Sequence, residues 1–321
     1  LLLAAEYLPP ADQLKDPEGK PLTARQIPGR GTAYAILAGV YAWIAGYGQE
    51  PEYYALGIEA AGKVIGDPNY RLVASPEEVC TEVLPGNSEE GVFEVCYDDS
   101  RGEYKDFGSY IGGTVEKWPV LKGTTPASRR KFFIRNETVE RLYTPEDLRL
   151  QAYFADFFRM KEEPVSVTQG AAYVRMWREV EYYSGGIYDG TPRTLLANDI
   201  LIRLPDILML RAEMKAATGD REGAVADLDV VRRRAGVAGY SEAEGDLRRA
   251  IQLERDRELL FQTGVRYFDY MRNHTYNLLK GGFRDLTETD VAAGALFLPV
   301  SLDAMNNNPK VKQTAYWVGK F

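Results

Sequence analysis

Two separated segments of the chain carry the pattern of closely packed helix pairs. In residues 28–72, small side chains alternate with aromatic ones at helical spacing, and a Gly-rich turn precedes a second helix expected over 52–65. Residues 205–235 repeat the pattern: Pro205 suits a first helical turn, and Gly236 suits a helix end. Such pairs need neighbours to complete a core. The sequence therefore predicts a mainly α fold of tetratricopeptide-like hairpins, in which both hairpins pack into one helical body with the helix at 246–262.

The stretch between the hairpins, residues 73–198, has a different composition. It is rich in Gly, Pro, Ser, Thr and aromatic residues, with a short strand pattern at 91–97 and a helical period only around 144–160. Long irregular segments in compact proteins are usually functional, so we expect the ligand site in this insertion.

The C-terminal region, residues 199–321, continues the helical pattern beyond the second hairpin. A short helix is expected at 265–273, and the tail at 295–317 has strand-like and turn character. No low-complexity linker divides the chain, so a single domain over residues 1–321 is expected.

The chain starts with LLLAAEYLPP, which has the pattern of the last turns of an amphipathic helix running into a Pro-marked loop. Neither a charged leader nor a cleavage site is visible, so we expect that further residues precede this start and that a missing helical layer leaves an apolar patch nearby. No apolar run approaches the roughly 20 residues of a membrane span.

Composition excludes several classes of function. A net charge of −8, from 39 basic and 47 acidic residues, argues against a nucleic-acid partner or an anionic membrane surface. The single histidine, His274, leaves nothing for a His-based metal site or a Ser-His triad, and no GxxxxGK or GxGxxG motif is present. We therefore expect no cofactor and no metal. Whether Cys80 and Cys96 form a disulfide stays open at this point.

The segment ERDRELLFQTGVRYFDYMRN, residues 254–273, mixes arginines and acids with apolar residues. At helical spacing Glu254 and Glu258 share a face with Leu247 and Ile251, so both carboxylates are expected to be half-buried. A buried acid is either tuned for proton transfer or held by an arginine.

Four segments, taken in order, resemble the C-terminal signature of the SusD/RagB family of outer-membrane nutrient-binding proteins. They are ILIRLPDILMLRAEMKAATGD, AVADLDVVRRRAG, LRRAIQLERDRELLFQTGVRYFDYMR and LFLPVSLDAMNNNPKVKQ. The first hairpin resembles the earlier repeat of that family. Departures from the family pattern occur at Pro205, Gln262, Val265 and the closing QTAYW.

The resemblance implies a function as well as a SusD-like fold. Members of this family are lipid-anchored at the surface of Bacteroidetes-like bacteria, bind oligosaccharides or related nutrients, and cover a TonB-dependent transporter. They are not enzymes, and they are generally longer at the N-terminus, where a signal peptide and an acylated cysteine lie. The implied partners are thus a glycan and a SusC-like transporter, with contact to the membrane only through a lipid anchor on the missing N-terminal part.

The resemblance also implies that the arginine and glutamate segment is a structural framework. Glu254 and Glu258 are then expected to form ion pairs across helices with Arg232, Arg266 or Arg272. Structural ion pairs perturb carboxylates as strongly as catalysis does, so an acid or base role is the weaker interpretation.

The aromatic residues of the insertion are the candidates for sugar binding, because ring faces accept the C–H faces of sugars while a polar rim binds hydroxyls. Any single one is more often part of a local core. The least core-like positions are Gly-flanked: Trp118 in GGTVEKWP, then Tyr182, Tyr183 and Tyr188 around Gly185 and Gly186. The wider candidate set adds Tyr97, Tyr104, Phe107, Tyr110 and Trp177.

The sequence therefore predicts a cell-surface glycan-binding protein that delivers oligosaccharide to a TonB-dependent outer-membrane transporter. Two alternatives from other classes remain: a helical-repeat scaffold that binds a protein partner, and a carboxylate-dependent glycoside hydrolase. Glycan binding separates the first from the scaffold, and release of reducing sugar would identify the hydrolase.

Overall fold

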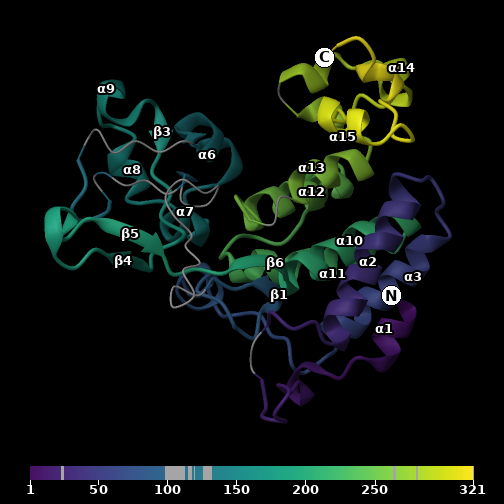
Figure 1. The fold of residues 1–321 in the computed structure, drawn as a ribbon, viewed down its shortest axis with the longest axis horizontal. Coiled ribbons are helices and arrows are strands. Elements are labelled where there is room, and N and C mark those ends of the chain that lie inside the picture. Colours follow the sequence, from purple (N-terminus) through teal and green to yellow (C-terminus); the bar gives the residue numbers. More distant parts are fainter. Residues whose placement is uncertain are drawn as a thin grey trace.

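The computed structural model describes residues 1–22, 25–97, 113, 114, 118, 120–125, 132–262, 265–279 and 281–320. Helices dominate this part of the chain (Figure 1), which confirms the predicted mainly α class. The longer helices are α2 (Arg30–Gly46), α3 (Tyr53–Ile65), α10 (Leu204–Thr218), α11 (Arg221–Arg234), α12 (Leu247–Glu258) and α13 (Val265–Arg272).

Short elements connect these helices. The short α-helices are α1 (Leu2–Tyr7), α4 (Pro76–Glu78), α6 (Asn136–Leu142), α7 (Leu148–Tyr153), α8 (Phe157–Met160), α9 (Val165–Thr168), α14 (Glu288–Ala292) and α15 (Leu302–Asn307). Turns of 3-10 helix are η1 (Ala11–Gln13), η4 (Gly186–Tyr188), η5 (Glu242–Glu244), η6 (Tyr276–Leu278), η7 (Gly281–Asp285) and η8 (Ala315–Trp317), and η2 (Val79–Val83) is a π turn. The strands are β1 (Gly91–Val95), β2 (Ile134–Arg135), β3 (Ala171–Ala172), β4 (Val180–Tyr182), β5 (Pro192–Leu195) and β6 (Asp199–Arg203).

Both predicted helical hairpins are present. Small residues set the spacing between their helices: Ala38, Ala42 and Ala61 are fully buried, and a Cβ on Gly57 would lie 2.4 Å from the Sδ of Met214. In the second hairpin, Gly219 ends α10 with a φ of +86°, which favours glycine. The helices on either side of each turn lie close to the predicted bounds.

Helix α10 lies at the centre of the helical body and contacts α2, α3, α11 and α12. These helices lie side by side (Figure 1), and their apolar side chains form one core, so the predicted packing of both hairpins with the helix at 246–262 is confirmed. That helix ends at Glu258, four residues before the predicted end at 262. The backbone departs from helical geometry at Leu259, with φ −101° and ψ 25°, and Phe261, with a φ of +55°, prevents the helix from resuming.

The insertion contains more regular structure than its composition indicates. Its part from Ile134 to Asn198 forms a separate lobe of short helices and two-stranded sheets, at the left of Figure 1, around a second core that includes Tyr153 and Trp177. The helix expected at 144–160 is broken into α7 and α8, since Asp156 has a φ of +43°.

The antiparallel pair of β1 and β6 connects the insertion to the helical body. Strand β1 lies where the sequence predicted a strand, whereas β6 was missed. Strand β6 runs directly into α10, with Arg203 as the residue before the helix. The two cysteines are not joined to each other, since Cys80 is buried in the second core and Cys96 is exposed.

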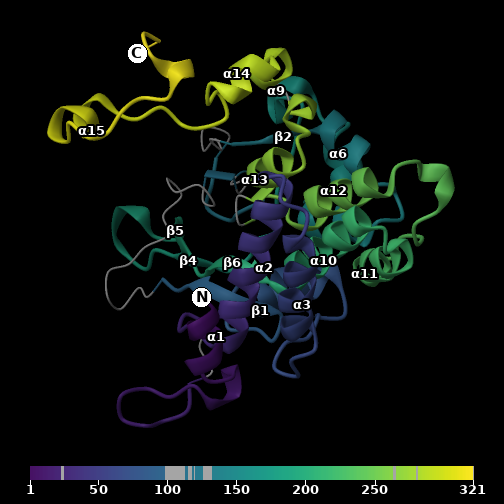
Figure 2. The ribbon, with the colours of Figure 1, turned by 90° about the vertical axis from the view of Figure 1, so that its right-hand side faces the viewer.

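The predicted strand-like character of the tail is wrong. The described residues of 295–317 form α15 and η8 and no strand, because the Oγ of Ser301 accepts a hydrogen bond from the amide of Ala304 and starts a helix. Figure 2 shows this segment extending away from the helical body.

The expected N-terminal helix end is present as α1. Leu1, Leu2, Leu3 and Tyr7 are exposed on it, and the expectation of further residues before them stays a prediction. None of the helices in the described ranges has the length and apolar character to cross a membrane.

Candidate functional site

The hairpin loop, residues 183–191, joins β4 to β5 and presents two aromatic rings to solvent. The rings of Tyr183 and Tyr188 lie 5.7 Å apart between centroids and are inclined by 40°. Tyr183 is 43% exposed, Tyr188 is 60% exposed, and Ile187 at the tip is 91% exposed. The loop therefore carries an apolar surface with no core to bury it.

Backbone hydrogen bonds hold the hairpin loop in shape. The amide of Tyr183 donates to the carbonyl of Thr191 at 2.9 Å, and the amide of Gly190 donates to the carbonyl of Tyr183 at 2.9 Å. The Oδ1 of Asp189 accepts from the amide of Gly185 at 2.6 Å. Gly185, Gly186 and Gly190 all have positive φ in open space, so backbone conformation selects glycine there. The two rings are thus displayed on a defined loop.

Tyr182 is separated from the other two tyrosines. Successive side chains of a strand point to opposite faces, so Tyr182 shares the face of Val180, which packs against the second core. Tyr182 is half-buried, and only Tyr183 and Tyr188 are brought together by the structure.

Trp118 is half-buried, and the described segment 120–125 approaches the hairpin loop at Gly123. A Cβ on Gly123 would lie 2.1 Å from the carbonyl oxygen of Gly190, so the two backbones are in close contact. Leu121 packs against the second core. This close approach brings the segment after Trp118 next to the loop that carries Tyr188.

The remaining aromatic candidates have different surroundings. Tyr104, Phe107 and Tyr110 lie outside the described residues. Trp177 is 2% exposed and belongs to the second core. The hydroxyl of Tyr97 donates to Asp199 at 2.7 Å, beside the pair of β1 and β6. Neither Trp177 nor Tyr97 adds a ring to the surface of the hairpin loop.

The arginine and glutamate segment belongs to a buried ion-pair network. Among the described residues, five arginines and five carboxylates form a continuous set of pairs: Arg149, Arg203, Arg232, Arg234 and Arg257 with Glu90, Asp147, Glu244, Glu254 and Glu258. The positive and negative charges balance. Glu254 and Glu258 are 0% and 1% exposed, so they are more deeply buried than the predicted half-burial.

Glu258 is surrounded by three guanidinium groups. It pairs with Arg203 at 2.6 Å, with Arg149 at 3.3 Å and with Arg234. Burial alone raises the pKa of Glu258, but the three arginines outweigh that effect and lower the pKa to about 2. Such a group stays ionised at neutral pH and has no proton to donate.

The predicted partners of Glu254 and Glu258 are only partly those observed. Arg232 does pair with Glu254, at 3.2 Å. Arg272 instead pairs with Glu213 and Asp269, both at 2.7 Å, and Arg266 pairs with Asp256 at 3.0 Å. Both lie on α13, which follows the end of α12, so they meet acids on other faces.

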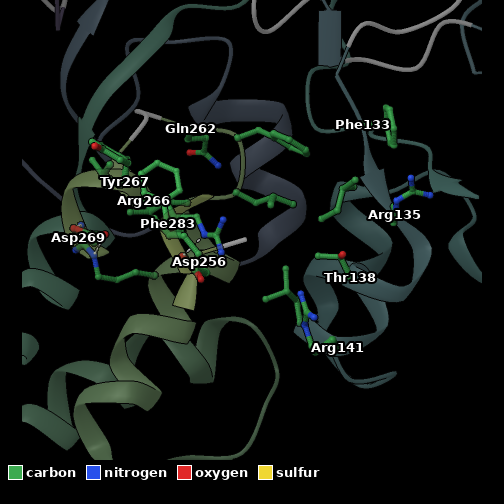
Figure 3. A pocket seen from close by; sticks show the side chains of 18 residues that line it. Phe133, Arg135, Thr138, Arg141, Asp256, Gln262, Arg266, Tyr267, Asp269 and Phe283 are labelled. Carbon is green, nitrogen blue, oxygen red and sulfur yellow. Dashed lines mark hydrogen bonds and ion pairs between the residues drawn. The ribbon is translucent and has the colours of Figure 1, made fainter. Parts of the chain in front are cut away.

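A cleft with a volume of about 680 Å³ lies between α6 and the segment that joins α12 to α13 (Figure 3). One wall carries Phe133, Arg135, Thr138 and Arg141, and the opposite wall carries Gln262, Arg266, Tyr267 and Phe283. A volume of this size is typical of sites for small ligands.

Sequence reasoning missed this cleft. Its walls are distant in sequence, and Arg135 and Arg141 lie in a segment without a recognised motif. The departures from the family pattern at Gln262 and Val265 were a signal, because both residues line the cleft. Within the described ranges no group of three or more His, Cys, Asp or Glu residues is arranged to hold a metal ion.

Comparison with known proteins identifies related folds. A model of the SusD family matches residues 89–317. The crystal structure of a SusD homolog from Bacteroides thetaiotaomicron superimposes with a TM-score of 0.78 at 22% identity, covering 98% of this chain and 64% of that chain. The predicted SusD-like fold is thus confirmed.

Two glycan-binding proteins also share this fold. Surface glycan-binding protein A from Bacteroides uniformis has a TM-score of 0.65 at 20% identity, covering 97% of this chain and 65% of its own. Surface glycan-binding protein A from B. thetaiotaomicron, in complex with laminarihexaose, has a TM-score of 0.65 at 19% identity, covering 97% of this chain and 67% of its own. No protein with a curated description matches significantly. The chain spans 64% of the length of the SusD homolog.

Proposed function

Because the chain belongs to the SusD family, we propose that it binds an oligosaccharide or related nutrient at the cell surface and delivers it to a TonB-dependent outer-membrane transporter. The observation that carries the binding step is the inclined pair of Tyr183 and Tyr188 on an exposed loop. Their ring faces are free to stack on sugar rings, as aromatic residues do in carbohydrate sites.

Likeness of fold supports a glycan as the ligand. A surface glycan-binding protein with the same fold forms a complex with laminarihexaose. The proposal includes a place at the outer membrane, with a lipid anchor on sequence before residue 1, and a SusC-like transporter as partner. Co-purification with a SusC-like transporter tests the delivery step.

The geometry of Glu258 argues against the glycoside hydrolase alternative. A glycosidase needs a carboxylic acid that protonates the leaving group and a second carboxyl group within reach of the substrate. Glu258 is 1% exposed, is paired with three arginines, and has its pKa lowered to about 2. We therefore propose a binding protein and not an enzyme.

The experiment begins with a glycan array and continues by calorimetric titration of the oligosaccharide that binds, with laminarihexaose included as a probe. Tyr183→Ala and Tyr188→Ala are expected to weaken binding about 5- to 150-fold each, because loss of a stacked ring costs roughly 1 to 3 kcal/mol. Both rings are substantially exposed, so the melting temperature is expected to stay close to that of the wild type.

The matched control is Tyr7→Ala, which removes a 76% exposed tyrosine from α1 and is expected to leave binding unchanged. Absence of binding to any glycan would favour the protein-interaction scaffold. Binding that survives both hairpin variants would place the glycan on a different surface.

A further inference from the structure

We propose that the cleft between α6 and the α12–α13 connection binds an acidic sugar, such as a uronic acid, at a site separate from the hairpin loop. In Figure 1, β4 and β5 lie well away from α12 and α13. This site goes beyond the proposed function, which needs only the surface at Tyr183 and Tyr188.

The charge of the cleft favours an anion. Its lining includes Arg135, Arg141, Arg255 and Arg266 but only Asp256 and Asp269, so four positive charges face two negative ones. Arg255 is held between Asp206 and Asp269, at 2.7 Å from each. The protein as a whole has a net charge of −8, so this positive excess is local.

Arg135 and Arg141 provide the excess positive charge. Both side chains are exposed, and among the described residues neither forms an ion pair or a hydrogen bond through its side chain. Guanidinium groups bind carboxylates through paired hydrogen bonds, which are stronger than neutral ones. Arg266 lies on the opposite wall and keeps 60% of its side chain exposed while its Nε contacts Asp256. A carboxylate between the walls would thus meet arginines from both sides.

Gln262 offers a buried donor that nothing in the described structure satisfies. Its Oε1 accepts a hydrogen bond from the Nε of Arg203 at 2.8 Å, and an arginine can only donate, which fixes the orientation of the amide. The Nε2 is therefore directed away from Arg203, toward the space between the two walls in Figure 3. The side chain is 6% exposed and its Nε2 has no hydrogen-bond partner in the described part of the chain. A buried amide of this kind is satisfied by an acceptor on a ligand, such as a sugar hydroxyl.

The aromatic residues supply an apolar wall for a ring. Tyr267 and Phe283 lie 5.7 Å apart between ring centroids at an angle of 61°, and the hydroxyl of Tyr267 donates to the carbonyl of Leu296, which fixes that ring. Phe133 stands on the facing wall and is 45% exposed. The cleft thus offers arginines that can bind a carboxylate, an amide that can bind a hydroxyl, and ring faces that can pack on C–H groups. An acidic sugar carries all three kinds of group.

The test compares the methyl glycoside of glucuronic acid with that of glucose by ligand-detected NMR titration of the full chain; the two differ only at C6, which is a carboxylate in the first and a hydroxymethyl group in the second. The glucuronide is expected to bind at least tenfold more tightly, and its binding is expected to weaken as the salt concentration rises. In the double variant Arg135→Gln/Arg141→Gln, affinity for the glucuronide is expected to fall at least tenfold, while Arg233→Gln, which removes an exposed arginine of α11, leaves it unchanged.

Three results would overturn the proposal. Equal affinity for the two sugars would show that the carboxylate is not recognised. Full affinity in the double variant would show that the sugar does not bind in the cleft. Cyclohexanecarboxylate binding as tightly as the glucuronide would show that the sugar hydroxyls are not recognised. Tyr183→Ala is expected to leave glucuronide binding intact, so failure at the hairpin loop and failure at the cleft are distinguishable. If the double variant unfolds, the single variants Arg135→Gln and Arg141→Gln replace it, and each is expected to weaken glucuronide binding.

Discussion

Replacing Glu258 by glutamine tests whether the buried ion-pair network stabilises the fold. The substitution preserves the shape of the side chain but removes one of the five negative charges that balance five arginines in the network of described residues, and this one is 1% exposed. Arg203, Arg234 and Arg149 each keep another acid, Glu90 for the first two and Asp147 and Glu254 for the third. One positive charge is then left buried without compensation.

The size of the effect follows from the pKa of Glu258. A lowering from the ordinary 4.5 to about 2, at about 1.4 kcal/mol for each pKa unit, corresponds to about 3 kcal/mol of folding free energy at neutral pH. Because the folded-state pKa is lowered, this stabilisation is present above about pH 4.5 and is lost as the pH falls toward 2. The difference in stability between the wild type and Glu258→Gln is therefore expected to shrink across that interval.

Urea denaturation followed by tryptophan fluorescence, repeated at several pH values from 7 to 3, measures this difference. The control is Glu242→Gln, which removes a surface carboxylate paired with Arg221 and is expected to change the free energy of unfolding by less than about 0.5 kcal/mol. A loss below about 1 kcal/mol for Glu258→Gln, or a loss that is the same at pH 7 and pH 3, would refute the reasoning.

Two further predictions concern packing and thiol chemistry. Gly57→Ala is expected to destabilise the protein by about 1 to 3 kcal/mol, because the new Cβ would lie 2.4 Å from the buried Sδ of Met214. Gly39→Ala, at a site in α2 with no atom within 4 Å of the new Cβ, is expected to stabilise the protein by about 0.5 to 1 kcal/mol. Thermal melts measure both effects, and an equal shift of the melting temperature in the two variants would contradict the packing described for Gly57. The native protein is expected to show one rapidly reacting thiol, Cys96, because Cys80 is buried and burial raises its thiol pKa to about 12. Titration with a thiol reagent before and after unfolding measures the number of reactive thiols. Two rapidly reacting thiols in the native state would contradict the prediction.

The sequence predicted the helical body better than it predicted the insertion. The alternation of small and large residues indicates closely packed helices. Pro205 and Gly219 mark the start and the end of α10. The lobe around Tyr153 and Trp177 is assembled from helices of four to seven residues and strands of two to four, and such pieces are too short to show a period. Strand β6 was missed because its ILIR residues continue without a break into a helical pattern.

The candidate site divides in the same way. Tyr183 and Tyr188 were recognised because the glycines between them indicate a turn, which brings its flanking residues together. Arg232 was expected beside Glu254, but the role of Arg149 was not, since it lies more than a hundred residues away in a region without a repeating pattern. Contacts between distant segments depend on the assembled fold and leave no local trace in the chain. The division into a single domain over residues 1–321 stays a prediction.

The sequence separations within the buried ion-pair network have a consequence for the order of folding events. Arg234 and Glu90 are 144 positions apart, Arg203 and Glu90 are 113 apart, and Arg149 and Glu258 are 109 apart. Because closing such long loops costs entropy, we expect these contacts to form after the local helices. Interactions absent from the transition state change mainly the rate of unfolding. We therefore expect the network to slow unfolding: weakening it should shorten the lifetime of the native state while leaving the refolding rate nearly unchanged.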